Sequence, residues 1–336
     1  MMSTAFGGPM STAFGGPGPL FLLLLALGID AVLGAWLGRV LPDVAGLTQR
    51  LCAVLDRRLN RTDRREKDRL LRGALIMVVL LAAAAAAGWG VEALAAGGSA
   101  IGTVLTLLVL LASLRGGTAA ARVRAVRHAL EQPGIEGARA AVTGLTRRYI
   151  HAMDAHAIAR AAIEHAARSF CRKTVAPAFW FILLGVPGLL MWCVVDGADA
   201  AIGRAGPRHE RFGLTAARLD DALNALPARL AGLLLALAAP FTGGSPGTAL
   251  RTLGTDARLH PSLNMGWPLA GMAGALDLAL AGPHKDGGVT VNDPWVGRGR
   301  ARVIPADIRK AQALSAVATL LLAGLVGVLM VGVARL

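Results

Sequence analysis

The sequence predicts an all-α, polytopic integral membrane protein with about five to seven apolar helices that can cross a hydrocarbon layer of about 30 Å. Of its 336 residues, 54% are apolar and only 17% are charged, whereas soluble domains are nearer one quarter charged. Aromatic residues make up 4% of the chain. Ala, Leu and Gly therefore fill the apolar segments, as suits membrane helices that approach each other closely.

The chain begins with a repeat. Residues 1–18 contain the octapeptide Met-Ser-Thr-Ala-Phe-Gly-Gly-Pro twice in tandem, and this Gly and Pro content predicts a disordered tail. Residues 19–336 are predicted to form a single membrane domain. The three cysteines are scattered along the chain, so neither a disulfide framework nor a zinc site is expected.

The first apolar segments are long and uninterrupted. Residues 20–41 can span, although Asp30 lies within them and must sit near the interface or point into the bundle. Residues 73–96 and 101–114 follow as two more spans. The uncharged connection 97–100 between them predicts a tight hairpin whose turn lies on the far side of the membrane.

The next two apolar segments allow two interpretations. Residues 175–195 are interrupted by Pro177 and by the break at 185–188, and residues 226–241 are barely one helix long. Each segment can cross the membrane, or each can enter and return as a re-entrant hairpin. Crossing would place residues 196–229 on the opposite side from the other polar segments. Residues 313–333, near the C-terminus, are uninterrupted and are predicted to form the final span.

Positive charge sets the expected orientation. The polar segments are 43–72, 115–175, 196–229 and 243–312. The first is densely basic and the second begins at Arg115, so both are placed in the cytoplasm by the positive-inside rule. We therefore expect a multi-pass protein of the cell inner membrane with most polar segments cytoplasmic. We expect the net charge of +14 to set the orientation in the membrane and to bind anionic substrates or membrane lipid. Nucleic acid is not an expected partner.

One polar segment stands out within the apolar C-terminal half. It reads His260-Pro261-Ser262-Leu263-Asn264-Met265-Gly266-Trp267-Pro268. This mixture of polar side chains, prolines and glycine is unsuited to a helix that faces lipid. At membrane depth, such residues normally line a cavity or a site.

That segment resembles the H-P-S-P-N-x-G-W-P motif of the CobD/CbiB family, the adenosylcobinamide-phosphate synthases of cobalamin biosynthesis. The resemblance covers most of the chain, and further blocks match the family in order and spacing. They are Ala157–Glu164, Ala176–Trp180, Asp199 with Ile202-Gly203, Ala217–Arg229, Asp293–Gly297 and Asp307-Ile308-Arg309. The resemblance implies that the chain joins adenosylcobyric acid, a corrinoid, to an aminopropanol phosphate through an amide.

A carboxylate is a poor acyl donor, so the chemistry and the family imply ATP and Mg²⁺, although no phosphate-binding loop motif is present. The matched acids become the catalytic candidates, namely Glu164, Asp199, Asp220 and Asp221. Asp220 and Asp221 are also the candidate ligands of Mg²⁺. The alternative for Asp220 and Asp221 is an ion pair with Arg218 on the surface of a helix.

The matched blocks also supply candidates for substrate binding. The arginines would hold phosphate or carboxylate groups, and they are Arg148, Arg160, Arg218 and Arg229. The other candidates are Asn224, His260, Ser262, Asn264 and Trp267. Asn264 and Ser262 can hydrogen-bond corrin amides and Trp267 offers a flat face to the macrocycle, or these residues cap and pack a helix end. His260 is a ligand of cobalt or a structural hydrogen-bonding group.

The sequence departs from the family pattern directly after Glu164. Arg168, Ser169 and Arg172 stand where the family motif has Glu, Asn and Asp. If those acids bind Mg²⁺, the exchange removes ligands and adds repulsion. The alternative function is therefore a catalytically weakened or non-catalytic paralogue, acting as a membrane scaffold for other cobalamin-biosynthesis enzymes or as a corrinoid-binding protein.

Overall fold

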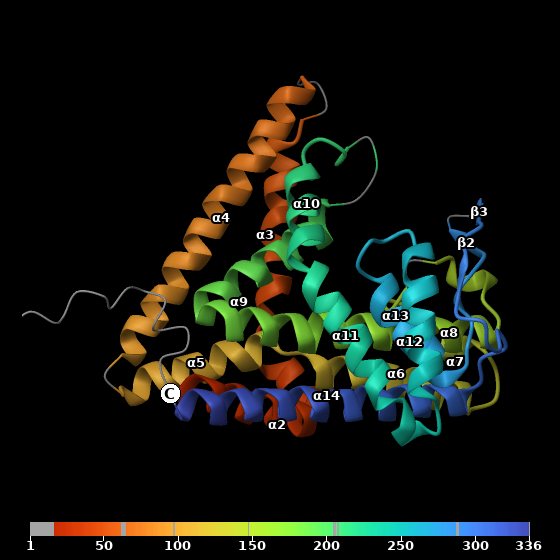
Figure 1. Cartoon of the computed structure of the whole chain (residues 1–336). Coiled ribbons are helices and arrows are strands. Elements are labelled where there is room, and N and C mark those ends of the chain that lie inside the picture. The colour runs from red at the N-terminus through yellow and green to blue at the C-terminus, as the bar shows by residue number, and fades with distance from the viewer. Residues whose placement is uncertain are drawn as a thin grey trace, which may run out of the picture.

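The computed structural model describes residues 17–61, 65–96, 98–146, 148–203, 206, 208–286 and 289–335. The tandem octapeptide therefore lies outside the described residues except for its last proline, where the first helix already begins. In chain order the helices are α2 (Pro17–Val40), α3 (Val44–Leu59), α4 (Glu66–Ala95), α5 (Ala100–Ser113), α6 (Gly116–Leu130), α7 (Glu136–Val142), α8 (Ala155–Phe170), α9 (Ala176–Ile202), α10 (Leu214–Leu223), α11 (Ala225–Ala238), α12 (Pro246–Asp256), α13 (Gly266–Leu276) and α14 (Pro305–Ala334) (Figure 1).

The prediction of an all-α membrane fold is confirmed. Among the described residues, six helical segments are long and apolar enough to cross a membrane. The strands are short and form two antiparallel pairs, which the sequence did not predict. They are β1 (Leu280–Ala281) with β4 (Trp295–Val296), and β2 (His284–Asp286) with β3 (Val289–Val291).

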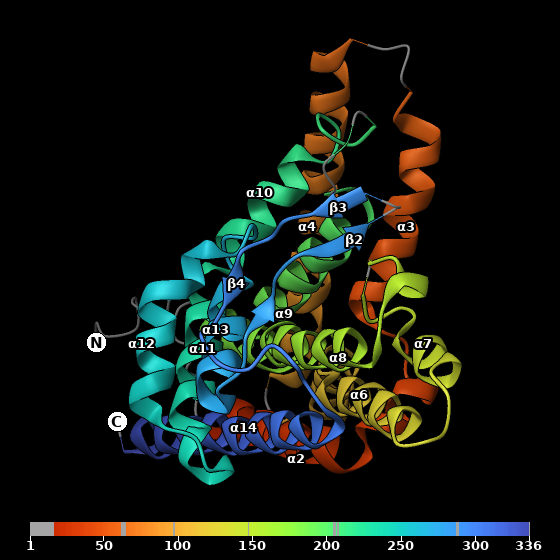
Figure 2. The same cartoon turned by 90° about the vertical axis from the view of Figure 1, so that its right-hand side faces the viewer.

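The first and last spans lie side by side. Helix α14 packs along α2 and also contacts α6, α8 and α11 (Figures 1 and 2). Its buried positions Ile308, Ala311, Leu314, Ala318 and Leu322 recur at helical spacing, which gives the helix one face toward the protein. On its other faces Leu320 and Val328 are each 70% exposed, as expected where a helix meets lipid rather than water.

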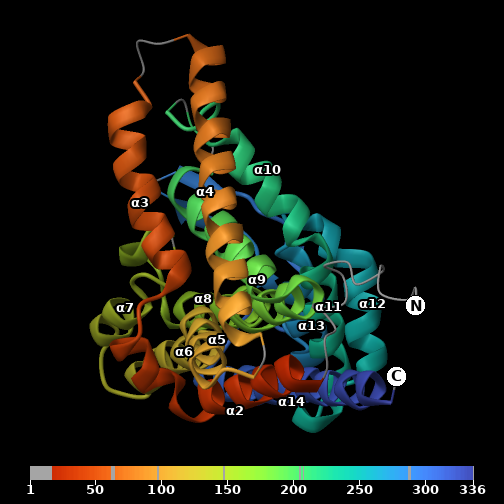
Figure 3. The ribbon, with the colours of Figure 1, turned by 90° about the vertical axis from the view of Figure 1, so that its left-hand side faces the viewer.

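The basic segment 43–72 is not a loop. Apart from the connection between the two helices, it forms α3 and the first turns of α4, and the second span therefore begins before residue 73. Helix α3 is amphipathic and packs on α9 through the buried Ala45, Thr48 and Cys52. The α3–α4 pair projects beyond the remaining helices (Figure 3). The basic side chains therefore lie on a helical hairpin, because helices buried on one face tolerate charge on the other.

The hairpin between the second and third spans is present as predicted. Helix α4 ends at Ala95 and α5 begins at Ala100. The two helices approach so closely that a Cβ at Gly102 would lie 2.2 Å from the backbone nitrogen of Ala95. Glycine at this position is thus required by the crossing of two backbones.

The fourth apolar segment doubles back on itself. Within α9, Gly185 has φ 64° and ψ −152°, and Pro187 follows it. Glu92 of α4 accepts a hydrogen bond from the backbone N–H of Val186 at 3.0 Å, which satisfies a donor that the break would leave without a partner. The two arms of α9 form a V in Figure 1. The returning arm brings Asp196 back to Arg172, which precedes the helix.

The fifth segment also returns. Helix α11 has 14 residues, and with the 3₁₀ turn that continues it to Thr242 it is one of the six described segments long enough to cross a membrane. A 3₁₀ turn (Ala239–Thr242) and Gly243 at φ 80° end it, and α12 then runs back beside α11 and α13 (Figure 1). The chain therefore reverses direction at Gly185 and again at Gly243. Both segments also count among those long enough to cross a membrane, so the choice between crossing and re-entrant segments stays open.

Candidate functional site

Helix α8 presents a stripe of charged side chains. Arg160, Glu164, Arg168 and Arg172 follow each other at four-residue spacing, so they lie along one helix face over about 18 Å. The helix is started by Asp154, whose carboxylate accepts the N–H of Ala157 at 2.7 Å.

The far end of this stripe is a π-helical turn (Cys171–Val175) that continues into α9. A π-turn carries one residue more than an α-turn and changes the direction of the side chains around it. Arg172 and Lys173, although consecutive, both reach Asp196 on the returning arm of α9.

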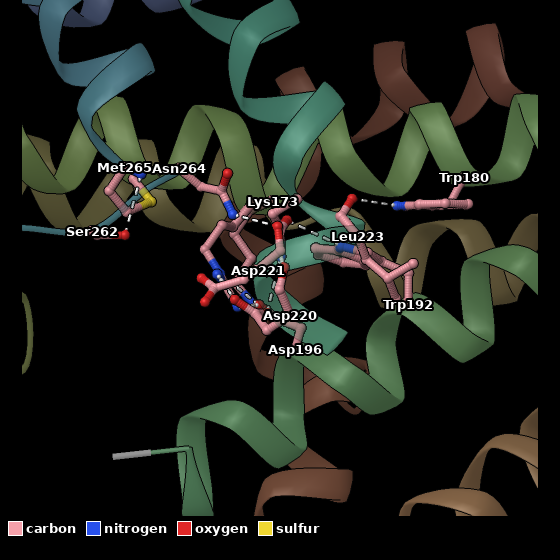
Figure 4. Close-up of polar contacts among 12 residues, drawn as sticks. Lys173, Trp180, Trp192, Asp196, Asp220, Asp221, Leu223, Ser262, Asn264 and Met265 are labelled. Carbon is pink, nitrogen blue, oxygen red and sulfur yellow. Dashed lines mark hydrogen bonds and ion pairs between the residues drawn. The ribbon is translucent and has the colours of Figure 1, made fainter. Parts of the chain in front are cut away.

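The ion pairs at this turn form a cluster of Arg172, Lys173, Asp196 and Asp220, here called the Arg172 cluster (Figure 4). Arg172 donates from Nη1 to Oδ2 of Asp220 at 2.9 Å and from Nη2 to Oδ1 at 2.6 Å. Its Nε donates to Asp196 at 2.7 Å, and Lys173 Nζ donates to the other Asp196 oxygen at 3.1 Å. The two carboxylates expose only 7% and 9% of their side chains, so the cations compensate charges that are withdrawn from solvent.

Hydrogen bonds tie the Arg172 cluster to the surrounding helices. The Asn224 amide donates to Asp220 Oδ1 at 2.9 Å, and its own oxygen accepts from the indole of Trp192 at 3.2 Å. Asn264 donates to the backbone oxygen of Asp221 at 2.8 Å. The cluster thereby joins α9, α10 and the 260–268 segment (Figure 4).

The remaining two acids lie beside this cluster. Asp199 is one turn beyond Asp196 and interacts electrostatically with Arg172 and Asp220. Asp221 is half-buried. Burial raises the pKa of Asp220, and the neighbouring guanidinium opposes this shift. The surface ion pair with Arg218 is the wrong interpretation for Asp220, because Arg218 is exposed and Asp220 pairs with Arg172.

The geometry does not fit a magnesium ion at Asp220. Both of its carboxylate oxygens accept from Arg172, and one also accepts from Asn224. A metal would have to displace the guanidinium. Within the part of the chain that the structure describes, no group of three or more His, Cys, Asp or Glu side chains is placed to hold a metal. The assignment of Mg²⁺ to Asp220 and Asp221 stays a prediction.

Glu164, in the middle of the stripe, is held by two partners. Arg148 pairs with its Oε2 at 2.9 Å, and the backbone N–H of Ala281 donates to Oε1 at 3.0 Å. Ala281 has φ 59°, a left-handed conformation that costs energy for a residue with a Cβ. Glu164 thus fixes the start of the β1–β4 region against α8.

Arg160, near the start of α8, also contacts the β1–β4 region. Its guanidinium lies 5.1 Å from the ring centroid of Trp295 and donates to the backbone oxygen of Ala301 at 2.8 Å. Gly282, at φ 76°, leaves room for the indole, because a Cβ there would lie 2.6 Å from ring atoms of Trp295. The cation–π contact and the glycine together hold the tryptophan in place.

The 260–268 segment forms a compact turn before α13. The N–H of Ser262 donates to His260 Nδ1 at 3.0 Å, and the N–H of Met265 donates to Ser262 Oγ at 3.3 Å. Burial lowers the pKa of His260, so its ring is neutral at pH 7. With Nδ1 as acceptor, the hydrogen-bond network assigns the proton to Nε2. His260 is thereby presented as a neutral donor, and Ser262 stabilises the turn before α13, whose N-cap is Met265.

The remaining arginines lie apart from the stripe. Arg229 is exposed and sits 4.7 Å from the ring centroid of Trp267, and Arg218 is exposed on α10. The structure thus gathers the predicted residues in two neighbouring groups along α8. Asp199, Asp220, Asp221, Asn224 and Asn264 lie around the Arg172 cluster, and Arg148, Arg160 and Glu164 lie at the other end.

Sequence reasoning missed the role of three residues. It treated Arg172 only as a departure from the family motif, and it assigned no role to Lys173 or Asp196. A signal was nevertheless present, because a carboxylate that directly follows an apolar segment, as Asp196 does, needs a cationic partner if it is buried.

Comparison with known proteins is consistent with this architecture. The model of the CobD/Cbib protein family matches residues 23–315. A cobalamin biosynthesis protein CobD from Sinorhizobium sp is 39% identical over 312 residues, which cover 91% of this chain and 97% of that protein. Proteins of the same name from Brucella melitensis biotype 1 and Rhodobacter capsulatus are 43% and 34% identical, over 68% and 87% of this chain and 69% and 91% of their own lengths. No solved structure matches.

Proposed function

Because the chain belongs to the CobD/Cbib protein family, whose relatives are named for cobalamin biosynthesis, we propose that it is the enzyme that forms adenosylcobinamide phosphate. The reaction joins the propionate carboxylate of adenosylcobyric acid to the amine of an aminopropanol phosphate. One C–N bond forms, and one carboxylate oxygen leaves. ATP, which we propose from the chemistry, would take up that oxygen as phosphate.

The observation that carries this proposal is the meeting of the α8 stripe with the 260–268 segment. Both substrates carry an anion, and a ligase must hold a carboxylate and a phosphate side by side. Arg168 is exposed at the middle of the stripe, and its charge, like that of Glu164, acts on His260. A guanidinium and a neutral imidazole N–H can each donate hydrogen bonds to a phosphate or carboxylate, and the bond from the guanidinium is charge-assisted.

Some of these residues can contact substrate, and others position the residues that do. Arg168, which is exposed, and His260, with its Nε2–H donor, can contact the anionic groups, and Trp295, 39% exposed, offers a flat face to the corrin. Glu164 and Asn264 are positioning residues, because each is hydrogen-bonded to the backbone of a neighbouring segment. Holding two reactants in one orientation is itself a large part of the catalysis of a bimolecular ligation.

One observation bears on the alternative of a weakened or non-catalytic paralogue. Arg172 neutralises Asp220 and Asp196. If this guanidinium blocks a metal-dependent site, Arg172→Asp should raise the ligation rate in the presence of Mg²⁺. If the Arg172 cluster is part of the active architecture, the same substitution should lower both activity and stability, because it places three carboxylates together.

Complementation tests the proposal in cells. A strain that lacks the synthase and receives cobyric acid should grow without cobalamin when it expresses this chain. Arg168→Gln should lower growth markedly, whereas Arg251→Gln, an exposed substitution on α12, should leave it unchanged. Absence of growth with folded protein in the membrane would contradict the enzyme and favour the scaffold.

A further inference from the structure

A second polar site lies on the other flank of α8, and it shares only Lys173 with the Arg172 cluster. A cavity of about 140 Å³ is lined by Gly38, Asp43, Arg115, Thr118, Ala119, Arg122, His165, Ser169 and Lys173. These residues come from the end of α2, from α6 and from α8 with its π-turn. Helices α6 and α8 lie side by side next to α2 (Figure 2).

The lining of this cavity is cationic. Arg115, Arg122 and Lys173 face a single carboxylate of the lining, that of Asp43. Lys173 is shared with the Arg172 cluster through its bond to Asp196, so its charge is partly compensated. Arg122 is exposed at the mouth of the cavity. The set therefore keeps a net positive charge, which an anionic group such as a phosphate monoester would complement.

Arg115 is fixed in this position. It is buried, and its Nη2 donates to the backbone oxygen of Leu41 at 2.8 Å while its Nε donates to that of Ala112 at 3.3 Å. The guanidinium thus sits against carbonyls at the ends of α2 and α5, where a cation is favourable. A rigid cation in the wall lowers the entropic cost of binding an anion.

An apolar cavity adjoins the cationic one. It has a volume of about 280 Å³, lies between α2, α6, α8 and α14, and shares Ala119 and Ser169 with its neighbour. Its polar lining groups are largely bonded within the protein: Ser315 and Thr319 donate to carbonyls of their own helix and Gln312 to Ala120. The one carboxylate of the lining, Asp30, accepts the N–H of Gly117 at 3.0 Å. The wall therefore offers apolar surface. The neighbouring Leu320 is 70% exposed on the face of α14 that we assign to lipid.

We infer that the cationic cavity between α2, α6 and α8 binds a phosphate group, and that the adjoining apolar cavity accommodates an alkyl substituent when the phosphate belongs to a lipid. The shared chemistry is that of a phospholipid headgroup and of a small phosphate ester. This inference rests on the cavities and not on the proposed ligation, so either can fail without the other.

Thermal stability of the purified full-length protein in a neutral detergent tests it, because a ligand that binds only the folded state raises the melting temperature. The probes are inorganic phosphate, aminopropanol phosphate and phosphatidic acid, each at constant ionic strength. Diacylglycerol is the control for a lipid without phosphate. Stabilisation by phosphatidic acid alone identifies a lipid phosphate, and stabilisation by the small phosphates identifies a soluble one. Either result supports the site.

Two substitutions on α6 decide whether the effect comes from this cavity. Arg122→Gln should weaken binding of the active probe at least about tenfold, because it removes one charge-assisted contact. Arg124→Gln is the matched control, since this residue is also exposed on α6 and lies outside the cavity lining. If no phosphate probe raises the melting temperature, or if Arg122→Gln and wild type respond equally, the inference is wrong.

Discussion

Removal of the Arg172 side-chain charge should strongly destabilise the protein. Arg172→Met keeps much of the side-chain volume but leaves Asp196 and Asp220, 7% and 9% exposed, without their shared cation. Breaking a buried pair by removing one partner typically costs about 3–5 kcal/mol. With about 2 °C of melting temperature per kcal/mol in a large domain, the expected fall is on the order of 5–10 °C.

The assay is a melting curve followed by tryptophan fluorescence in detergent, because Trp192 is bonded into this network through Asn224. Arg218→Met is the matched control, since Arg218 is exposed on the neighbouring helix, and it should melt like wild type. Adding Asp220→Asn to Arg172→Met should restore part of the lost melting temperature, because a neutral amide costs less free energy to bury than an unpaired carboxylate.

The stability of Arg172→Met should change with pH in a defined direction. Burial raises the pKa of Asp220, and loss of Arg172 removes the cation that opposes the shift. A carboxyl group whose folded-state pKa is raised takes up a proton on folding, so its folded form gains stability as pH falls and loses it as pH rises. The difference in melting temperature between Arg172→Met and wild type should therefore be smaller at pH 5 than at pH 7. A variant that melts within about 1 °C of wild type at pH 7, well under the expected shift, would refute the reasoning.

Three further predictions follow from the fold. Gly185→Ala should lower the yield of folded protein several-fold in size-exclusion profiles, because residue 185 has φ 64°, whereas Gly254→Ala, with open space around it, should not; equal yields would contradict the hairpin in α9. Glu164→Gln should increase hydrogen exchange in residues 280–296, since it weakens a charge-assisted bond to that region; unchanged exchange would remove its positioning role. A cysteine placed at residue 99 in Ser99→Cys should react with an impermeant reagent on intact spheroplasts, and labelling only after permeabilisation would reverse the orientation.

Much of the fold could be predicted from the sequence. The spans around residues 20–41 and 313–333 and the hairpin at 97–100 follow from uninterrupted apolar runs and an uncharged turn. The reversals of the chain at Gly185 and Gly243 could not be located with certainty, because apolar length alone does not show where a chain turns back. Pro187 and Gly185 marked the break, but the hydrogen bond from Val186 to Glu92 that completes it joins residues far apart in sequence.

The candidate site was only partly predictable for the same reason. Motif matching located Glu164, Asp220 and Asn264, but it could not show what each of them contacts. Arg172 and Asp196 meet only because α9 returns, so their pairing is a property of the tertiary fold. Three-dimensional contacts therefore changed the interpretation of Asp220 from a metal ligand toward the partner of a guanidinium.

The ligation proposed for this chain can be measured directly. The purified, folded protein is incubated with adenosylcobyric acid, aminopropanol phosphate, ATP and Mg²⁺, and the product is identified by mass spectrometry. We expect a product with the mass of both substrates less one water, formed in proportion to the protein. Arg168→Gln should reduce its formation at least about tenfold through loss of a charge-assisted contact. Folded protein that yields no such product, with or without added Mg²⁺, would contradict the proposed ligation.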